Sequence, residues 1–375
     1  MPTPFDNLFA KNVPESIQAK CTKEIFKHLT TRKLIAATQV SKNWKQFIDD
    51  QFQQQINEER VISIASFFTH DREHAIKYTN QLAGGLTNKT FHVRTNSQHY
   101  VARQPGVESG AFINRNAEST NAKIAGELGV APSIYFSNDS GAMISRFIDN
   151  AQTMTPALLK DASNLQHATT ALKKIHSSNK RFANDCNVFE RNRIMLDILN
   201  KKHVELPKNF DSILPLINRI ENIIAKHSVE TAPCHNDTTP GNFLLSEGNM
   251  WIIDWEYSAN NDPLWDLVNL SMEAEFSDEQ DTQMLQAYYG DALSDQITER
   301  FKLYKPVVEY WVVLWSMVQI SNKNYDSLDT LENLEQKRMH NCKQILQDEK
   351  FMQTLVEAEE KIARHNQGNS PRFSS

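Results

Sequence analysis

The stretch CHNDTTPGN, residues 234–242, places a histidine, an aspartate and an asparagine around a Pro-Gly pair. All of its polar residues are common turn formers, so the segment by itself fits a simple turn. Twelve residues after Asn242, however, the apolar run WIIDWEY brings Asp254, and Glu256 follows two positions later. The run has the composition of a strand, so the sequence predicts an acidic loop followed by an acid at a strand end.

A loop carboxylate followed by a strand-borne acid suits phosphoryl transfer. One carboxylate must orient and deprotonate the attacking hydroxyl, while further oxygen ligands hold Mg²⁺ on the phosphates. We therefore expect Asp237, Asn242 and Asp254 to lie together at such a site.

The composition of the 375 residues is that of an ordinary globular chain, with 40% hydrophobic residues, 23% charged residues and a net charge of −6. The length predicts two or three structural units, and the acidity argues against a nucleic-acid groove. Four widely spaced cysteines without a CxxC pair indicate neither a disulfide framework nor a zinc site. The first residues lack the pattern of a secretory signal, and the run VVEYWVVLWSMVQI (307–320) is too short to span a membrane. We expect a cytoplasmic protein.

Upstream of the loop, residues from about 75 alternate β-formers around Gly84-Gly85 and Asn96-Ser97, which predicts a small sheet. A helix over 112–130 and a strand pair over 133–149 follow. Helices dominate thereafter, except for a hairpin over 232–256, and the last residues have a disordered composition. The expected domains are 1–60, 61–149 and 150–365, with a tail at 366–375.

Three upstream features extend the phosphotransfer reading. The Gly84-Gly85 turn suits backbone N–H groups over phosphates, Arg103 suits a phosphate contact, and Glu118 on the next helix suits a partner for Arg103. Taken alone, a Gly-Gly turn is more typical of a hairpin, and an arginine in a strand is more typical of a solvated sheet edge. Their order along the chain, followed by the acidic loop and the strand acid, is that of a kinase-like fold.

Six segments of the sequence together show a family resemblance. GGLTNKTF, YVARQPG, INRNAE, HNDTTPGN, IDWEY and NDPLWDLVN together resemble the choline/ethanolamine kinases, especially bacterial ones, of the aminoglycoside-phosphotransferase superfamily. The resemblance spans roughly residues 75 to 320. It implies an α+β, bilobal protein-kinase-like fold with a small β-rich N-lobe and a mainly helical C-lobe.

The resemblance also implies roles for single residues. Asp237 would be the catalytic base, with Asn242 and Asp254 as Mg²⁺ ligands, and Asp266 and His235 would be structural. ATP would lie between the lobes, with its adenine near SRFID (145–149). The implied cofactor-binding residues are Gly85, Thr87, Asn88, Arg103, Glu118, Phe147 and Ile148.

Trp311 and Trp315 stand one helical turn apart in EYWVVLWSMVQI, and aromatic faces bind quaternary ammonium groups. A Trp pair on an apolar helix is more usually core. The resemblance favours a substrate role for Trp315, whereas Trp311 lies one place earlier than the family's usual partner. Tyr257 matches a tyrosine lining the family's choline site, and Glu256 would offset the ligand's charge.

Residues 13–60 contain short amphipathic helical segments, which either begin the larger domain or form a separate unit. Residues 13–50 resemble an F-box, although about one extra helical turn separates Pro14 from Ile25. The resemblance implies docking on the adaptor subunit of a cullin-type ubiquitin ligase. The implied contact residues are Val13, Pro14, Ile17, Ile25, Leu29 and Leu34.

Two functions therefore stay open: an ATP- and Mg²⁺-dependent kinase for choline or a similar small amino alcohol, and an F-box adaptor whose kinase-like domain mainly binds a target. The intact Asp237, Asn242 and Asp254 favour the enzyme, and one chain can combine both. An F-box beside a bacterial-type kinase also suggests the hypothesis of a bacterial protein delivered into a host cytosol.

Overall fold

The computed structural model describes residues 78–82, 88–96, 98–104, 113–139, 141–208, 210–227, 229–323 and 327–368. The F-box-like segment, with all six of its expected contact residues, lies outside this part of the chain, as do Gly85 and Thr87. The chain divides into two compact units: residues 1–83 with 89–104, and residues 84–88 with 105–375.

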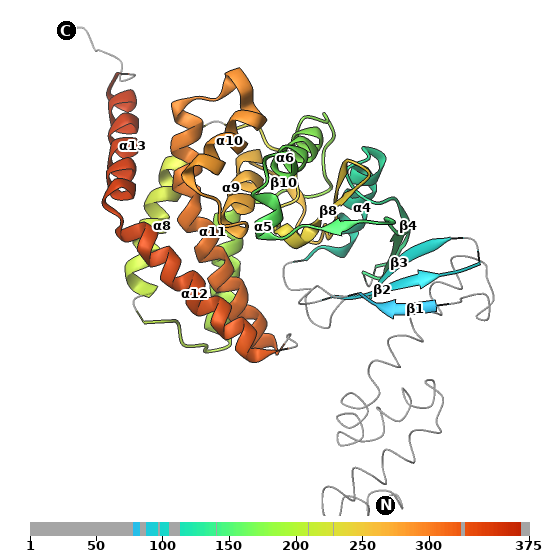
Figure 1. Cartoon of the computed structure of the whole chain (residues 1–375). Coiled ribbons are helices and arrows are strands. Elements are labelled where there is room, and N and C mark those ends of the chain that lie inside the picture. Colours follow the sequence, from blue (N-terminus) through green and yellow to red (C-terminus); the bar gives the residue numbers. More distant parts are fainter. Residues whose placement is uncertain are drawn as a thin grey trace, which may run out of the picture. The chain divides into compact units, whose positions relative to one another are not determined.

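The first unit contains the antiparallel strands β1 (Tyr78–Gln81), β2 (Lys89–Arg94) and β3 (His99–Gln104), visible in Figure 1. Phe91 pairs with Ala102 and Val93 with Tyr100, and all four side chains are buried. Alternate residues thus share one face, as period-two strands require. The expected hairpin around Asn96 is confirmed.

The second unit begins its regular structure with α4 (Arg115–Glu127) and the antiparallel pair β4 (Ile134–Ser137) and β5 (Met143–Arg146). The Asn114 side chain caps α4 by accepting the N–H of Ala117, because the first N–H groups of a helix lack intrahelical partners. Gly129 takes φ +66° just after the helix. The helix and strand pair expected here are both confirmed.

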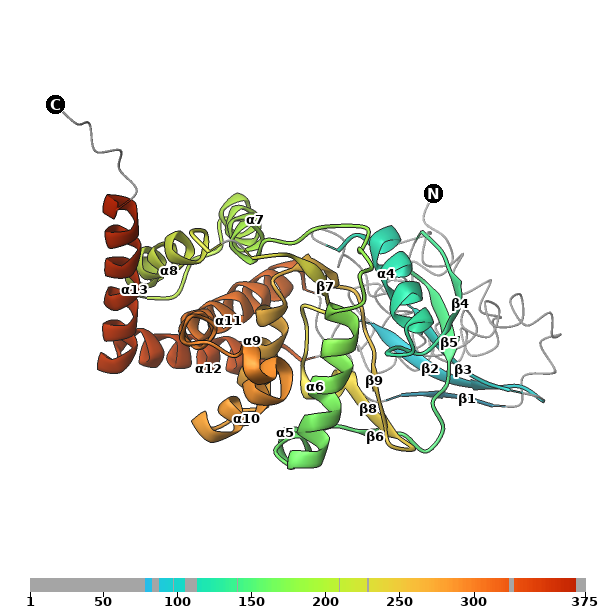
Figure 2. The same ribbon diagram turned by 90° about the horizontal axis from the view of Figure 1, so that it is seen from above.

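Helices then make up most of the second unit. They are α5 (Pro156–Leu159), α6 (Ala162–His176), α7 (Val188–Lys201), α8 (Phe210–Ile224), α9 (Pro263–Glu273), α10 (Asp278–Tyr289), α11 (Asp295–Asn322), α12 (Leu328–Gln347) and α13 (Glu349–Gly368). Figures 1 and 2 show α11 lying against α12 and α9. The apolar run 307–320 belongs to α11 and is buried almost throughout, so it forms core. Among the described helices, none is both long and apolar enough to cross a membrane.

Short strands hold the acidic loop. β7 (Ala232–Cys234) pairs with β10 (Ala259–Asn261), and β8 (Phe243–Ser246) lies between β6 (Gln152–Thr153) and β9 (Asn249–Ile252). The stretch 234–242 therefore leaves β7, passes through the 3₁₀ turn η4 (Pro240–Asn242) and enters β8. The hairpin then returns through β9 toward Asp254, as the sequence predicts.

Candidate active site

The loop that carries Asp237 is held by a buried carboxylate, Asp266 on α9. Its Oδ2 accepts the backbone N–H of His235 and its Oδ1 that of Asn236, both at 2.7 Å. The Thr238 hydroxyl donates to the Asp266 backbone carbonyl at 2.6 Å. A carboxylate that accepts two adjacent amides fixes their orientation. The geometry therefore supports the structural role expected for Asp266.

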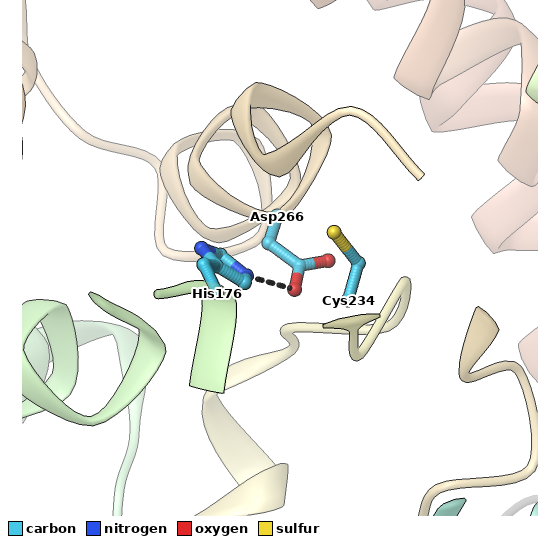
Figure 3. Close-up of side chains that lie close together, drawn as sticks. All are labelled: His176, Cys234 and Asp266. Carbon is cyan, nitrogen blue, oxygen red and sulfur yellow. Dashed lines mark hydrogen bonds and ion pairs between the residues drawn. The ribbon is translucent and has the colours of Figure 1, made fainter. Parts of the chain in front are cut away.

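His176, at the end of α6, extends this brace and was not predicted. Figure 3 shows its ring against Asp266, with Nε2 at 3.0 Å from Oδ2, and its Nδ1 lies 2.8 Å from the Tyr288 hydroxyl. Cys234 lies beside them, so the three side chains form a potential metal-ligand group. Burial raises the pKa of the Cys234 thiol well above its ordinary value, which disfavours the thiolate that a metal needs. Because His176 and Asp266 are also hydrogen-bonded, we assign these three side chains a structural role and not a metal-binding one.

The side chains of Asp237 and Asn242, both in the acidic loop, are hydrogen-bonded to each other. The Asn242 Nδ2 donates to Asp237 Oδ2 at 3.1 Å and to the Asp237 carbonyl at 2.9 Å. The Ile253 N–H donates to the Asn242 carbonyl at 2.9 Å, which brings the following Asp254 to the same place. Asp254 adopts φ +63°, a backbone conformation that Asp tolerates better than most residues.

Negative charge accumulates around Asp237. Burial, followed by the carboxylates of Asp254, Glu273 and Glu256, raises its pKa well above the ordinary aspartate value. Carboxylate oxygens of Glu118, Asp254 and Glu256 lie within 4.8 Å of one another. Hard cations such as Mg²⁺ prefer carboxylate oxygens, so Asp254, one of the two expected ligands, lies in a suitable environment for that ion.

Arg115, the first residue of α4, balances part of this charge. Its Nη1 lies 2.9 Å from Glu118 Oε2 and 3.2 Å from Glu256 Oε2. The Asn88 amide also donates to Glu256 Oε2, at 2.9 Å. The sequence offered one signal for Arg115, its i,i+3 spacing from Glu118. Arg103 lies on β3 in the first unit, and its expected pairing with Glu118 stays a prediction.

The expected acceptor-binding aromatics come together. The Trp315 Nε1 donates to the Tyr257 hydroxyl at 2.8 Å, and the Tyr257 and Trp311 rings meet edge to face with centroids 5.6 Å apart. All three side chains are buried. We call Tyr257, Trp311 and Trp315 the aromatic cluster. The Asn236 amide, next to Asp237, donates to the Tyr257 carbonyl at 3.0 Å and ties the cluster to the acidic loop.

Phe147 and Ile148, the expected adenine contacts, follow β5 directly. Ile148 is buried and Phe147 partly so. The Ser246 hydroxyl donates to the Asp149 carbonyl at 2.8 Å, which attaches this segment to β8, the strand that follows the acidic loop. Their role in nucleotide binding stays a prediction.

Comparisons with known proteins confirm both resemblances. The choline/ethanolamine kinase family profile matches residues 79–302, and the F-box profile matches residues 17–52. Protein LicA of Haemophilus influenzae is 28% identical over 243 residues, covering 62% of this chain and 90% of that protein.

Two solved structures are similar over most of their length. A choline/ethanolamine kinase family protein from Mesorhizobium loti has 31% identity and a TM-score of 0.66, covering 75% of this chain and 92% of that one. A LicA structure in complex with AMP has 25% identity and a TM-score of 0.60, covering 72% and 92%. The chain therefore belongs to the choline/ethanolamine kinase family and is a choline kinase-like phosphotransferase with the α+β, protein-kinase-like fold expected from its sequence.

Proposed function

We propose that this chain transfers the γ-phosphoryl group of ATP to the hydroxyl of choline or a similar small amino alcohol. The observation that carries the proposal is the hydrogen bond from Asn236 to the Tyr257 carbonyl, because it joins the loop of Asp237 to the aromatic cluster. Aromatic faces attract a quaternary ammonium group, and an acceptor bound there would have its hydroxyl near a carboxylate.

In this proposal Asp237 is the general base. The acceptor oxygen attacks the γ-phosphorus, the hydroxyl proton passes to the Asp237 carboxylate, and the bond to the bridging oxygen of ADP breaks. The Asn242 amide holds Asp237 Oδ2 in place. Burial and the nearby carboxylates raise the pKa of Asp237, and a carboxylate with a raised pKa is a stronger base.

Asn242 and Asp254 are the proposed Mg²⁺ ligands, and bound Mg²⁺ would neutralise charge on the phosphates. The proposed nucleotide contacts are Gly85, Thr87, Asn88, Arg103, Glu118, Phe147 and Ile148. The similar LicA structure with AMP supports nucleotide binding by this fold. We also propose a cytoplasmic location.

The test is a substrate screen with the full chain, ATP and Mg²⁺. Choline, ethanolamine, thiamine and an aminoglycoside are offered separately, ADP release is followed, and the phosphorylated product is identified by mass spectrometry. We expect acceptor-dependent ADP release, greatest with choline or a close analogue. ADP release that no acceptor stimulates, or stimulation by the aminoglycoside alone, would overturn the proposal.

The F-box profile match supports a second proposed function, docking of residues 13–60 on the adaptor subunit of a cullin-type ubiquitin ligase. Burial of an exposed apolar helical surface against a partner removes that surface from water, which favours binding. Pro14→Ala with Leu29→Ala should abolish capture of the purified adaptor while phosphotransfer continues. If the intact chain captures no adaptor, or the double variant loses stability and kinase activity together, the docking proposal fails.

A further inference from the structure

Asn236 occupies an unusual position for a residue outside the proposed chemistry. It precedes Asp237 directly, is 4% exposed and adopts φ +65°. Its side-chain Nδ2 donates to the Tyr257 carbonyl at 3.0 Å, and its Oδ1 accepts from Asn261 Nδ2 at 2.8 Å. Its backbone N–H donates to Asp266 at 2.7 Å. Asparagine is among the few residues that tolerate a positive φ, so backbone and side chain are both suited to this place.

These bonds place Asn236 between two parts of the site. Asp266 accepts the backbone N–H of Asn236 and so fixes the backbone that leads into Asp237. Its amide holds the backbone of Tyr257, whose ring and hydroxyl contact Trp311 and Trp315. The Tyr257 carbonyl also accepts from Arg191 Nη1, at a longer 3.3 Å. The shorter contact to this carbonyl therefore comes from the residue beside Asp237.

We propose that Asn236 is a positioning residue that sets the distance between Asp237 and the aromatic cluster, and thereby couples ATP cleavage to the bound acceptor. The inference rests on the proposed function. A small displacement of a reacting group lowers the rate steeply, by about a hundredfold for about 1 Å in well-organised sites. An acceptor hydroxyl displaced from Asp237 leaves room for water. The water oxygen then attacks the γ-phosphorus, one water proton passes to Asp237, and the bond between the γ-phosphorus and the bridging oxygen of ADP breaks. The products are then ADP and inorganic phosphate.

Two substitutions separate the amide from the backbone. Asn236→Gly keeps access to φ +65° and removes the amide, whereas Asn236→Ala removes the amide and adds strain at positive φ. With each variant, choline phosphorylation and phosphate release are measured together over a range of choline and ATP concentrations.

The expected result is the same loss in both variants, with the Ala variant also less stable. The choline kcat/KM should fall about tenfold, equivalent to about 1.4 kcal/mol. The ATP KM should stay within about twofold, and the ratio of free phosphate to phosphorylated choline should rise severalfold, because the amide acts on the acceptor side.

Asn260→Ala is the matched control. Asn260 is also a buried amide, and its Nδ2 donates to the carbonyls of Phe182 and Asn184 and to Asp185, none of which belongs to the acidic loop. This variant should unfold at a lower temperature than the wild type but keep the wild-type ratio of free phosphate to phosphorylated choline. A raised ratio here would show general loosening and overturn the positioning role.

The outcomes separate the two proposals. If the wild type phosphorylates no acceptor, the proposed function fails and the positioning role with it. If the wild type phosphorylates choline but Asn236→Gly keeps the wild-type ratio, only the positioning role is overturned. Should both Asn236 variants fail to fold, Asn261→Ala removes the donor to Asn236 Oδ1 and should give a smaller rise in the ratio. A wild-type ratio in that variant would also overturn the role.

Discussion

Removal of the Tyr257 hydroxyl should separate the structural and binding contributions of the aromatic cluster. In Tyr257→Phe the ring stays, so its face and its contact with Trp311 are kept. The Trp315 indole N–H, however, loses its acceptor at 2.8 Å, and Trp315 is only 8% exposed. We expect the free energy of unfolding to fall while choline affinity changes little.

The magnitudes follow from burial. A buried donor left without a partner costs about 1–3 kcal/mol, and we expect a loss in this range for Tyr257→Phe. Trp315→Leu instead removes the aromatic face, and a desolvated cation–π contact contributes about 1–2 kcal/mol. The choline KM should therefore rise about fivefold to thirtyfold in Trp315→Leu, while the ATP KM stays within about twofold.

Two variants on α11 serve as controls. Tyr310→Phe removes a buried hydroxyl that has no hydrogen-bond partner among the described residues, so it should not destabilise the fold. Phe301→Leu removes a buried aromatic ring ten positions before Trp311. It should lower stability without changing the choline KM. Chemical denaturation and steady-state kinetics with varied choline and ATP provide the measurements.

The result that would refute the reasoning is an equal rise in both Michaelis constants for Trp315→Leu, or the same choline KM in Trp315→Leu and Phe301→Leu. Either result would show that Trp315 only packs in the core and does not bind choline. A Tyr257→Phe protein as stable as the wild type would show that the indole N–H finds another acceptor.

Three further predictions concern the acidic loop and Asp254. Asp237→Ala should lower kcat at least about a hundredfold while ATP still binds, and near-normal turnover would remove Asp237 from the mechanism. Asp254→Ala should raise the Mg²⁺ concentration needed for half-maximal activity, because a lost ligand weakens the ion, and an unchanged requirement would count against its role. His235 is buried with its Nε2 against the Ile253 carbonyl, and burial lowers its pKa. Because the pKa of His235 is lower in the folded than in the unfolded chain, His235 contributes to stability above about pH 6.5, and this contribution is lost at lower pH. The resulting fall in the free energy of unfolding is at most about 1.4 kcal/mol between about pH 7.5 and about pH 5.5. In denaturant titrations, His235→Gln should show a smaller fall over this range, and an equal fall would assign the pH dependence to other groups.

Local patterns predicted the elements that hold the site. Alternating β-formers predicted β2 and β3, and the apolar run before Asp254 predicted the returning strand β9. Both predictions were possible because the alternating burial of a strand depends on residues that are neighbours in the sequence. The helical spacing of Trp311 and Trp315 likewise follows from the chain itself. That Tyr257 would meet them came only from the resemblance, since 58 residues separate it from Trp315.

Contacts between distant polar residues were not predictable in this way. Arg115 reaches Glu256 across 141 positions, and His176 reaches Asp266 across 90. No periodicity relates such pairs, and their geometry depends on how the helices pack. His176 is the last residue of an amphipathic helix, a position in which a histidine is often exposed. Nothing in the neighbouring sequence therefore predicted its burial beside Asp266. Asn236 looked like a turn residue for the same reason.

Most residues of the proposed site, Tyr257 included, lie within the range matched by the family profile, but the two tryptophans of α11 do not. Asp237, Asn242, Asp254 and Asp266 all fall within residues 79–302, the range matched by the family profile. Trp311 and Trp315 lie beyond it, on the part of α11 that α12 supports. There Arg338 of α12 lies 2.6 Å from Glu273 of α9 and 3.5 Å from the buried Glu309 of α11, so one guanidinium ties both helices together. The helix that carries the tryptophans is thus fixed to the helix of Asp266 by a residue outside the matched range. Because Trp311 and Trp315 lie outside the matched range, we expect the proposed acceptor contacts on α11 to differ more between this chain and its relatives than the loop around Asp237 does.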